Sequence, residues 1–119
     1  MASAIRRLQS ERDLEEVLEL SEKVPVMLLK HSTRCAISSH AHQEFETYSE
    51  GAGERGVECA LVLVVEDRAL SGEIARVLDV RHQSPQAILV KDRRAVWHDS
   101  HEGVNAAGLE EAEGSGVAS

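Results

Sequence analysis

The stretch of sequence that decides the fold is VPVMLLKHSTRCAISSH, residues 24–40. Its first part is a mostly apolar run that is too short for a helix, which predicts a buried strand over residues 24–30. Residues 31–34 are polar and predict a turn. Apolar side chains then recur at helical spacing and predict a helix over residues 35–48, with Ile37, Ala41, Phe45 and Tyr48 on one face. A strand therefore leads through a tight turn into a helix, and Cys35 lies at the start of that helix.

The segments on either side continue an alternation of helices and strands. Ser10 is a candidate N-cap, with Asp13 in capping-box position, for a helix over residues 11–22 that ends before Pro25. Downstream, the predicted elements are a glycine-rich loop (51–56), a valine-rich buried strand (57–65), a helix capped by Ser71, two strands (87–91 and 95–98) and a last helix (103–111). The last two strands, joined by residues 92–94, are typical of an antiparallel hairpin.

This order of elements predicts the fold class. Alternating helices and strands require parallel strands joined by right-handed crossovers, with helices on both faces. We therefore expect an α/β, thioredoxin-like fold in which a central mixed sheet of about four strands is flanked by helices on both faces. Residues 1–112 are expected to form a single domain that begins with a frayed arm over residues 1–9. Residues 113–119 are small and polar, which predicts a disordered tail.

The composition excludes several classes of function. The formal net charge is −8, and no stripe of lysine and arginine is present to neutralise phosphates, so we expect no nucleic-acid partner. The longest apolar runs, residues 26–29 and 60–65, are too short for a bilayer, so no membrane span is expected. The N-terminal segment is polar from Arg6 to Glu16, which predicts no signal peptide. Two cysteines then suit a reducing compartment, and we expect a cytoplasmic monomer.

Cys35 occupies a position with chemical consequences. The first turn of a helix has unpaired backbone N–H groups and a partial positive charge, which stabilise a thiolate. Arg34 and His31 are expected to add positive charge nearby. Because the thiolate is the nucleophile in thiol–disulfide exchange, this position favours a reactive cysteine.

Two neighbouring features narrow this chemistry. Ser38 stands where a dithiol oxidoreductase has its second cysteine, and it is expected to hydrogen-bond the thiolate from one helical turn away. Ser84 and Pro85 precede a predicted strand, where the thioredoxin fold holds a cis-proline beside the reactive cysteine. These features predict one-thiol chemistry, in which Cys35 attacks a mixed disulfide and carries the small thiol until a second small thiol removes it.

Several segments together resemble one known family. They are LKHSTRCAISS (29–39), DRALS (67–71), VRHQSPQAIL (80–89) and VWHDSH (96–101). Over residues 10–104 they are similar, in register, to the bacillithiol-system redox-active proteins, or monothiol bacilliredoxins, of the thioredoxin-like superfamily. One departure is that the family usually has proline directly after the cysteine, where this chain has Ala36. Alanine favours a helix and keeps the backbone N–H that proline lacks.

The resemblance implies a single active cysteine, Cys35, and removal of bacillithiol from S-thiolated client proteins in the manner of a monothiol glutaredoxin. Bacillithiol, or a similar low-molecular-weight thiol, is then a co-substrate, and no tightly bound cofactor is expected. The residues expected to support Cys35 or bind substrate are Thr33, Arg34, Ala36, Ile37, Ser38, Ser84 and Pro85.

Two alternatives to this function stay open at this point. Cys59 lies in the valine-rich strand and is expected to be a core residue. A Cys35/Cys59 redox switch is the alternative, because this strand is expected to neighbour the strand that leads to Cys35. The chain is alternatively a non-catalytic, thioredoxin-fold module for partner binding or stress response. A metal site is not expected, because no Cys-x-x-Cys pair accompanies the histidines. His82 and His98 are expected to be scaffold or surface residues.

Overall fold

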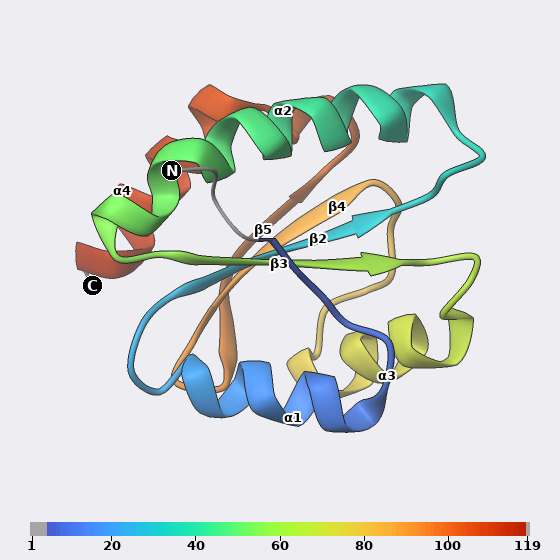
Figure 1. Ribbon diagram of the computed structural model, residues 1–119, viewed down its shortest axis with the longest axis horizontal. Helices are drawn as coiled ribbons and strands as arrows, with labels where there is room; N and C mark the ends of the chain where they lie inside the picture. The colour runs from blue at the N-terminus through green and yellow to red at the C-terminus, as the bar shows by residue number, and fades with distance from the viewer. Residues whose placement is uncertain (1–4, 119) are drawn as a thin grey trace.

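A five-stranded mixed sheet lies between two pairs of helices in the computed structural model, which describes residues 5–118, with side chains described through Gly114 (Figure 1). The elements are β1 (Ile5–Arg7), α1 (Glu11–Leu20), β2 (Val26–His31), α2 (Ala36–Ala52), η1 (Gly53–Arg55), β3 (Glu58–Leu63), α3 (Arg68–Leu78), β4 (Gln86–Lys91), β5 (Arg94–Ser100), η2 (His101–Gly103) and α4 (Ala106–Ala118). No helix among the described residues has the length and apolar character needed to cross a membrane. The predicted α/β, thioredoxin-like architecture is confirmed, with five strands in place of about four.

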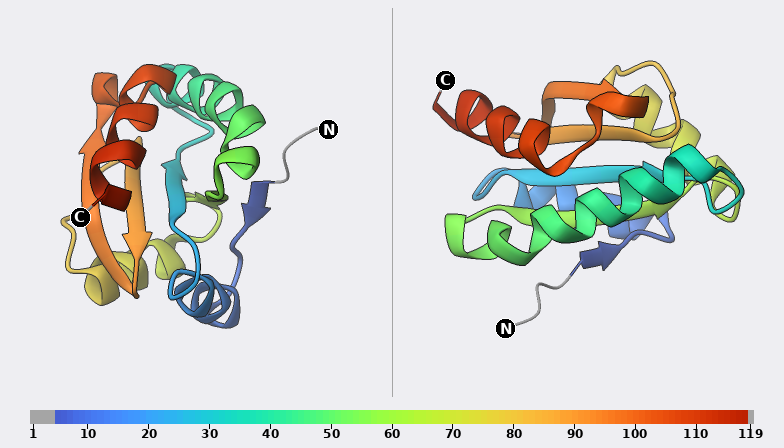
Figure 2. Two further views of the ribbon diagram at one scale, coloured as in Figure 1. Left: turned by 90° about the vertical axis from the view of Figure 1, so that its left-hand side faces the viewer. Right: turned by 90° about the horizontal axis from the view of Figure 1, so that it is seen from above.

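The strand order is β1-β3-β2-β4-β5, so β2 lies at the centre of the sheet. It pairs parallel with β3 and antiparallel with β4. All six residues of β2 are buried, which explains why its first four residues are an unbroken apolar run rather than an alternating one. The pairs α1 with α3 and α2 with α4 cover opposite faces (Figures 1 and 2), and each pair packs on its own apolar cluster.

The first strand corrects the predicted N-terminal arm. Residues 5–7 pair in parallel with β3, with Ile5 opposite Cys59 and Arg7 opposite Leu61. Leu8, directly after this strand, is fully buried and donates its N–H to Leu61 O at 2.8 Å. A three-residue strand is too short to show periodicity, and its partner lies far along the chain, so the sequence offers little signal for it. Residues 1–4 of the predicted arm lie outside the described residues.

Two helices, α2 and α3, extend beyond the predicted residues, whereas α1 ends at Leu20 instead of residue 22 and α4 begins at Ala106 instead of residue 103. α3 begins at Arg68 with Asp67 as its N-cap, so Ser71 is a buried residue of the first turn and not the cap. α2 continues past residue 48 to Ala52, because the last turn is held by burial of Ala52. In both cases tertiary packing extends a helix beyond the boundary that local sequence signals indicate.

The last helix continues past residue 112, where the sequence predicts the end of the domain, because α4 runs to Ala118. The residues after 112 are poor helix formers, but Glu113 gives this part of α4 a tertiary anchor. It is nearly buried, accepts from Tyr48 Oη at 3.2 Å and forms an ion pair with Arg55 Nε at 2.7 Å. A helix thus replaces the disordered tail predicted for residues 113–119, of which Ser119 lies outside the described residues.

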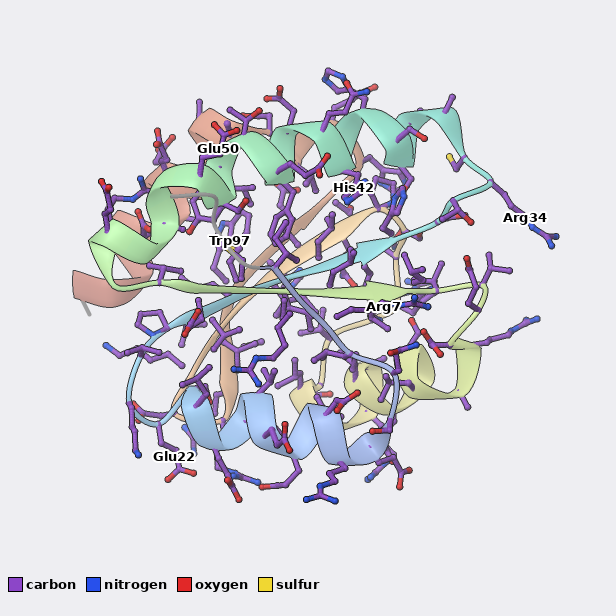
Figure 3. The ribbon with its side chains drawn as sticks, in the orientation of Figure 1. Arg7, Glu22, Arg34, His42, Glu50 and Trp97 are labelled. Carbon is purple, nitrogen blue, oxygen red and sulfur yellow. The ribbon has the colours of Figure 1, made fainter. Side chains whose placement is uncertain are left out.

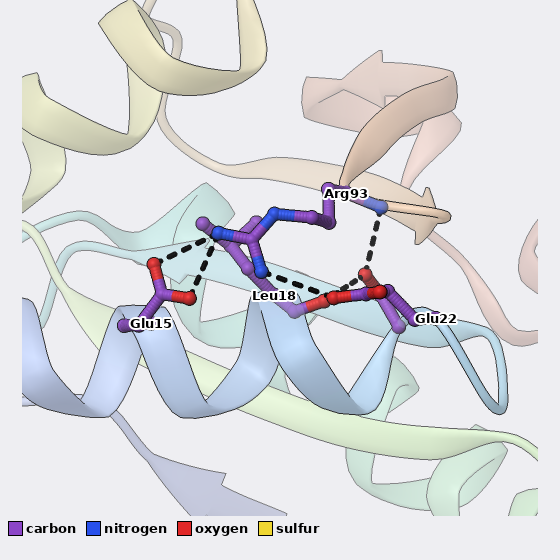
Figure 4. Close-up of polar contacts among 5 residues, drawn as sticks. Glu15, Leu18, Glu22 and Arg93 are labelled. Carbon is purple, nitrogen blue, oxygen red and sulfur yellow. Dashed lines mark hydrogen bonds and ion pairs between the residues drawn. The ribbon is translucent and has the colours of Figure 1, made fainter.

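Hydrogen bonds and ion pairs join the β4–β5 hairpin to α1 and the residues that follow it (Figure 4). Asp92 and Arg93 form its two-residue turn with φ of 52° and 64°, as a tight hairpin turn requires. The Arg93 backbone N–H donates to Ser21 Oγ at 2.9 Å, and its guanidinium pairs with Glu15 and Glu22. The predicted antiparallel hairpin is therefore confirmed, with β5 beginning at Arg94.

Candidate active site

The carboxyl ends of β2 and β3 meet at one edge of the sheet, and the β2–α2 turn that carries Cys35 lies there (Figure 1). Because β4 runs antiparallel to β2, the start of β4 lies at the same edge: Gln86 is opposite Lys30. Pro85 directly precedes Gln86, and the Ser84–Pro85 peptide bond is cis, as the fold predicts. The register therefore brings the Ser84–Pro85 segment to the edge that carries Cys35.

Cys35 is the N-cap residue of the 17-residue helix α2. Its backbone is extended, with φ −121° and ψ 126°, and no side chain caps this end of the helix through a hydrogen bond. The thiol is free and half-buried. The unpaired amides of the first turn are thus available to a negative charge on the Cys35 sulfur.

The turn before Cys35 is held by a buried network around Ser38. Ser38 is fully buried, and its Oγ accepts from the Ser32 N–H at 2.8 Å and lies 2.8 Å from His31 Nδ1. His31 is nearly buried and stacks on His42, with ring centroids 4.5 Å apart. Ser38 therefore shapes the turn, in place of the predicted hydrogen bond to the thiolate.

Charges near Cys35 differ from the sequence expectation in one respect. Burial, and secondarily the nearby His42, lower the pKa of His31 below its ordinary value of 6.5. His31 is therefore neutral at pH 7 and does not supply the expected positive charge. Arg34 is exposed and extends outward beyond this edge (Figure 3), so its cation is available to an approaching substrate.

The remaining predicted site residues fall into two groups. Thr33, Ala36 and Ile37 are exposed beside Cys35, and Thr33 Oγ1 donates to Glu66 Oε2 at 3.4 Å across to the β3–α3 turn. Ser84 is half-buried, with its hydroxyl oxygen enclosed and unpartnered, whereas Pro85 is buried and accepts from the His101 N–H at 3.0 Å. The exposed Ile37, at 51 % of its full accessible area, gives the edge an apolar element.

Sequence reasoning missed a second polar cluster at this edge, built on Lys30. This lysine is fully buried within β2, and its Nζ lies 3.0 Å from His82 Nδ1. His82 is thus a partner of Lys30 and not simply a surface residue. The available signal was the period of two along the strand, which places Lys30 on the same face as the core residues Val26 and Leu28.

Cys59 is separated from Cys35 by the length of the strands. It lies opposite Met27 near the start of β3, whereas Cys35 follows the end of β2. The four residues from Cys59 to Leu63 span about 13 Å along the strand, and a disulfide needs Cα atoms within about 7 Å. Burial also raises the pKa of the Cys59 thiol to about 12. A Cys35/Cys59 redox switch is therefore excluded in this fold.

Comparisons with solved structures identify the class first. A putative oxidoreductase with a thioredoxin fold matches at 33% identity and a TM-score of 0.80, over 92% of this chain and 93% of that one. Thioredoxin from Trypanosoma brucei brucei matches at 13% identity and 0.78, over 100% and 96%. Thioredoxin from Malassezia sympodialis matches at 15% identity and 0.77, over 95% and 90%. The last two likenesses show the fold alone, and together the three define a thioredoxin-fold protein.

The family follows from the sequence itself. Residues 6–109 match the monothiol bacilliredoxin family, BrxC, and the chain belongs to that family. This confirms the resemblance drawn from the segments around Cys35 and Pro85. Membership in this family, together with the thioredoxin fold, supports a thiol redox role for the protein.

Proposed function

We propose that the protein is a monothiol thiol–disulfide oxidoreductase that removes bacillithiol, or a similar low-molecular-weight thiol, from mixed disulfides on cytoplasmic proteins. The observation that carries the proposal is the half-buried free thiol of Cys35 at the uncapped N-terminus of α2, at an edge shared with the cis Ser84–Pro85 segment. Cys59 is buried and distant, so the chemistry is that of one thiol.

The reaction follows from these groups in two exchanges. The Cys35 thiolate attacks the small-thiol sulfur of the mixed disulfide, the bond to the client breaks, and the client thiolate leaves and takes a proton from water. The small thiol is then held on Cys35 in a new disulfide. A second small thiol, as its thiolate, attacks that small-thiol sulfur, which restores the Cys35 thiolate and releases the disulfide of two small thiols.

The surrounding residues have separate tasks in this scheme. The α2 amides stabilise the attacking and leaving Cys35 thiolate. Exposed Thr33, Arg34 and Ile37 contact the incoming substrate, while Ser84 and Pro85 form the opposite side of the cleavage site. The small thiol acts as co-substrate, no cofactor is tightly bound, and the protein works as a monomer.

The test uses a purified client peptide that carries one bacillithiol or glutathione in a mixed disulfide, with free small thiol present as reductant. Mass spectrometry follows the release of the small thiol from the peptide. Cys35→Ala is expected to abolish release above the rate without protein. Cys59→Ala is the matched control and is expected to retain the wild-type rate, because its thiol is buried at the far end of β3. Equal release by wild type and Cys35→Ala would refute the proposal.

A further inference from the structure

A pocket of about 380 Å³ opens between the end of β3 and the first turns of α3. Its lining residues are Val64, Val65, Arg68, Ser71, Gly72 and His82. The wall of the pocket is joined to the turn that carries Cys35, because the Val64 N–H donates to His31 O at 2.9 Å. A second link, from Thr33 to Glu66, ties the same two turns together. The pocket therefore belongs to the edge of the sheet at which Cys35 lies.

A buried positive charge lies directly behind the wall of this pocket. The Lys30 ammonium group contacts His82 Nδ1 at 3.0 Å, and Ser71 Oγ lies 3.4 Å from the same nitrogen. Lys30 is 0% exposed, and within residues 5–118 no carboxylate pairs with it. Burial without a counter-ion lowers its pKa to about 8. A buried cation without an anionic partner is costly, and a bound anion would offset that cost.

Some buried polar atoms near Lys30 also lack hydrogen-bond partners. Gln86 is opposite Lys30 on β4 and is 1% exposed. Its Nε2 donates to Arg81 O at 3.0 Å, but its Oε1 has no donor among the described residues. The enclosed Ser84 Oγ is likewise unpartnered. Unpaired buried polar atoms are rare in native proteins, and Gln86 is the cross-strand neighbour of Lys30, so the polar groups around this lysine can accept a further polar partner.

The rim of the pocket adds a second cation. Arg68 is exposed in the first turn of α3, and none of the ion pairs among the described residues includes it. The two carboxylates nearest in sequence are engaged elsewhere: Asp67 pairs with Arg7 at 3.5 Å, and Glu66 accepts from Thr33. Arg68 and Ser71 are three residues apart on α3, so both side chains reach the same side of the pocket.

We propose that this pocket binds a carboxylate of the small thiol whose sulfur is exchanged at Cys35, with Arg68 and Ser71 contacting the carboxylate and Lys30 attracting it through His82. The inference rests on the proposed function, since it assigns a recognition site to the same co-substrate. It makes the protein selective for small thiols that carry a carboxylate over neutral ones. A guanidinium and a buried ammonium are the groups that recognise carboxylates most strongly.

The test measures binding without turnover. The Cys35→Ser protein, labelled with ¹⁵N, is titrated with S-methyl bacillithiol or S-methylglutathione, and amide shifts are followed by NMR. We expect shifts at Val65, Arg68 and Gly72. Lys30→Met and Arg68→Gln in the same background are each expected to raise Kd by about tenfold, the usual size of a lost charged contact. Arg76→Gln, on the same helix but outside the pocket lining, is the matched control and is expected to leave Kd unchanged.

Two results would overturn this site. One is a set of shifts that leaves the pocket unaffected, and the other is equal affinity for the carboxamide form of the same ligand, which lacks the carboxylate charge. The outcome is separable from that of the proposed function, because the Cys35→Ser protein cannot turn over. Binding in the pocket with no release by wild type would refute the catalytic proposal alone. Release by wild type with no binding in the pocket would refute this site alone.

Discussion

Replacing Lys30 with methionine should stabilise the protein at neutral pH. Lys30 is 0% exposed, and its burial lowers the pKa from 10.5 to about 8. At 1.36 kcal/mol for each pKa unit, keeping this lysine charged costs the folded protein about 3 kcal/mol below pH 8. Loss of the hydrogen bond to His82 offsets about 1 kcal/mol of that. Methionine has nearly the same length without the charge, so the net gain expected at pH 7 is about 2 kcal/mol.

Titration of Lys30 also determines how the stability difference between the two proteins changes with pH. The folded protein releases the Lys30 proton near pH 8, whereas the unfolded chain keeps it until about pH 10.5. Between these values the unfolded state binds more protons, so the free energy of unfolding of the wild type rises with pH. The methionine variant lacks this contribution. Its advantage over the wild type should therefore be largest below pH 8 and should disappear as pH rises through the window from 8 to 10.5.

Urea denaturation followed by circular dichroism, at several pH values from 6 to 10.5, measures the gain in stability at pH 7 and its dependence on pH. The relevant quantity is the difference in the free energy of unfolding between the wild type and Lys30→Met, because the contributions of all other titrating groups cancel in this difference. A Lys30→Met protein that is less stable than wild type at pH 7 would refute this account of Lys30. A difference that stays constant across the pH range would refute it as well.

Three further perturbations test other parts of the structure. Ser38→Ala should lower the free energy of unfolding by about 1–3 kcal/mol, because it leaves buried turn groups unpaired; urea denaturation checks this against the exposed Ser39→Ala, which should change it far less. Glu113→Ala removes the anchor that Arg55 holds at the end of α4, so faster amide hydrogen exchange is expected there, with exchange in β2 unchanged. Cys59 should resist iodoacetamide at pH 8 in the folded protein and react after unfolding, and intact mass showing two adducts before unfolding would contradict its burial.

Much of the site was predictable because it depends on sequence patterns that span only short stretches of the chain. The apolar run, the polar turn and the helical spacing after Cys35 placed the thiol at a helix N-terminus, and the structure has it there. The cis peptide bond at Ser84–Pro85 was expected from the position of this dipeptide in a thioredoxin-like fold, and it is present. The strand, turn and helix signals around Cys35 need only a few neighbouring residues, so they can be recognised without knowledge of the rest of the chain.

Other features depend on contacts between distant parts of the chain. The strand β1 exists because residues 5–7 meet β3, and α4 is anchored past residue 112 because Glu113 meets Arg55. The position of Ser38, three residues after Cys35, predicts a hydrogen bond to the thiolate. Its actual partners, Ser32 and His31, lie on the preceding turn, whose path no local pattern gives.

The sequence by itself determined the α/β order, the thioredoxin-like architecture and the place of Cys35, because hydrophobic periodicity and turn chemistry act over short stretches. The tertiary structure alone decided that Cys59 is too far away to pair with Cys35, that His31 is neutral, and that Lys30 is buried beneath a pocket at the same edge of the sheet as the thiol. Each of these depends on strand register and on which loop covers which face. Both are set by long-range packing and not by the residues nearest in sequence.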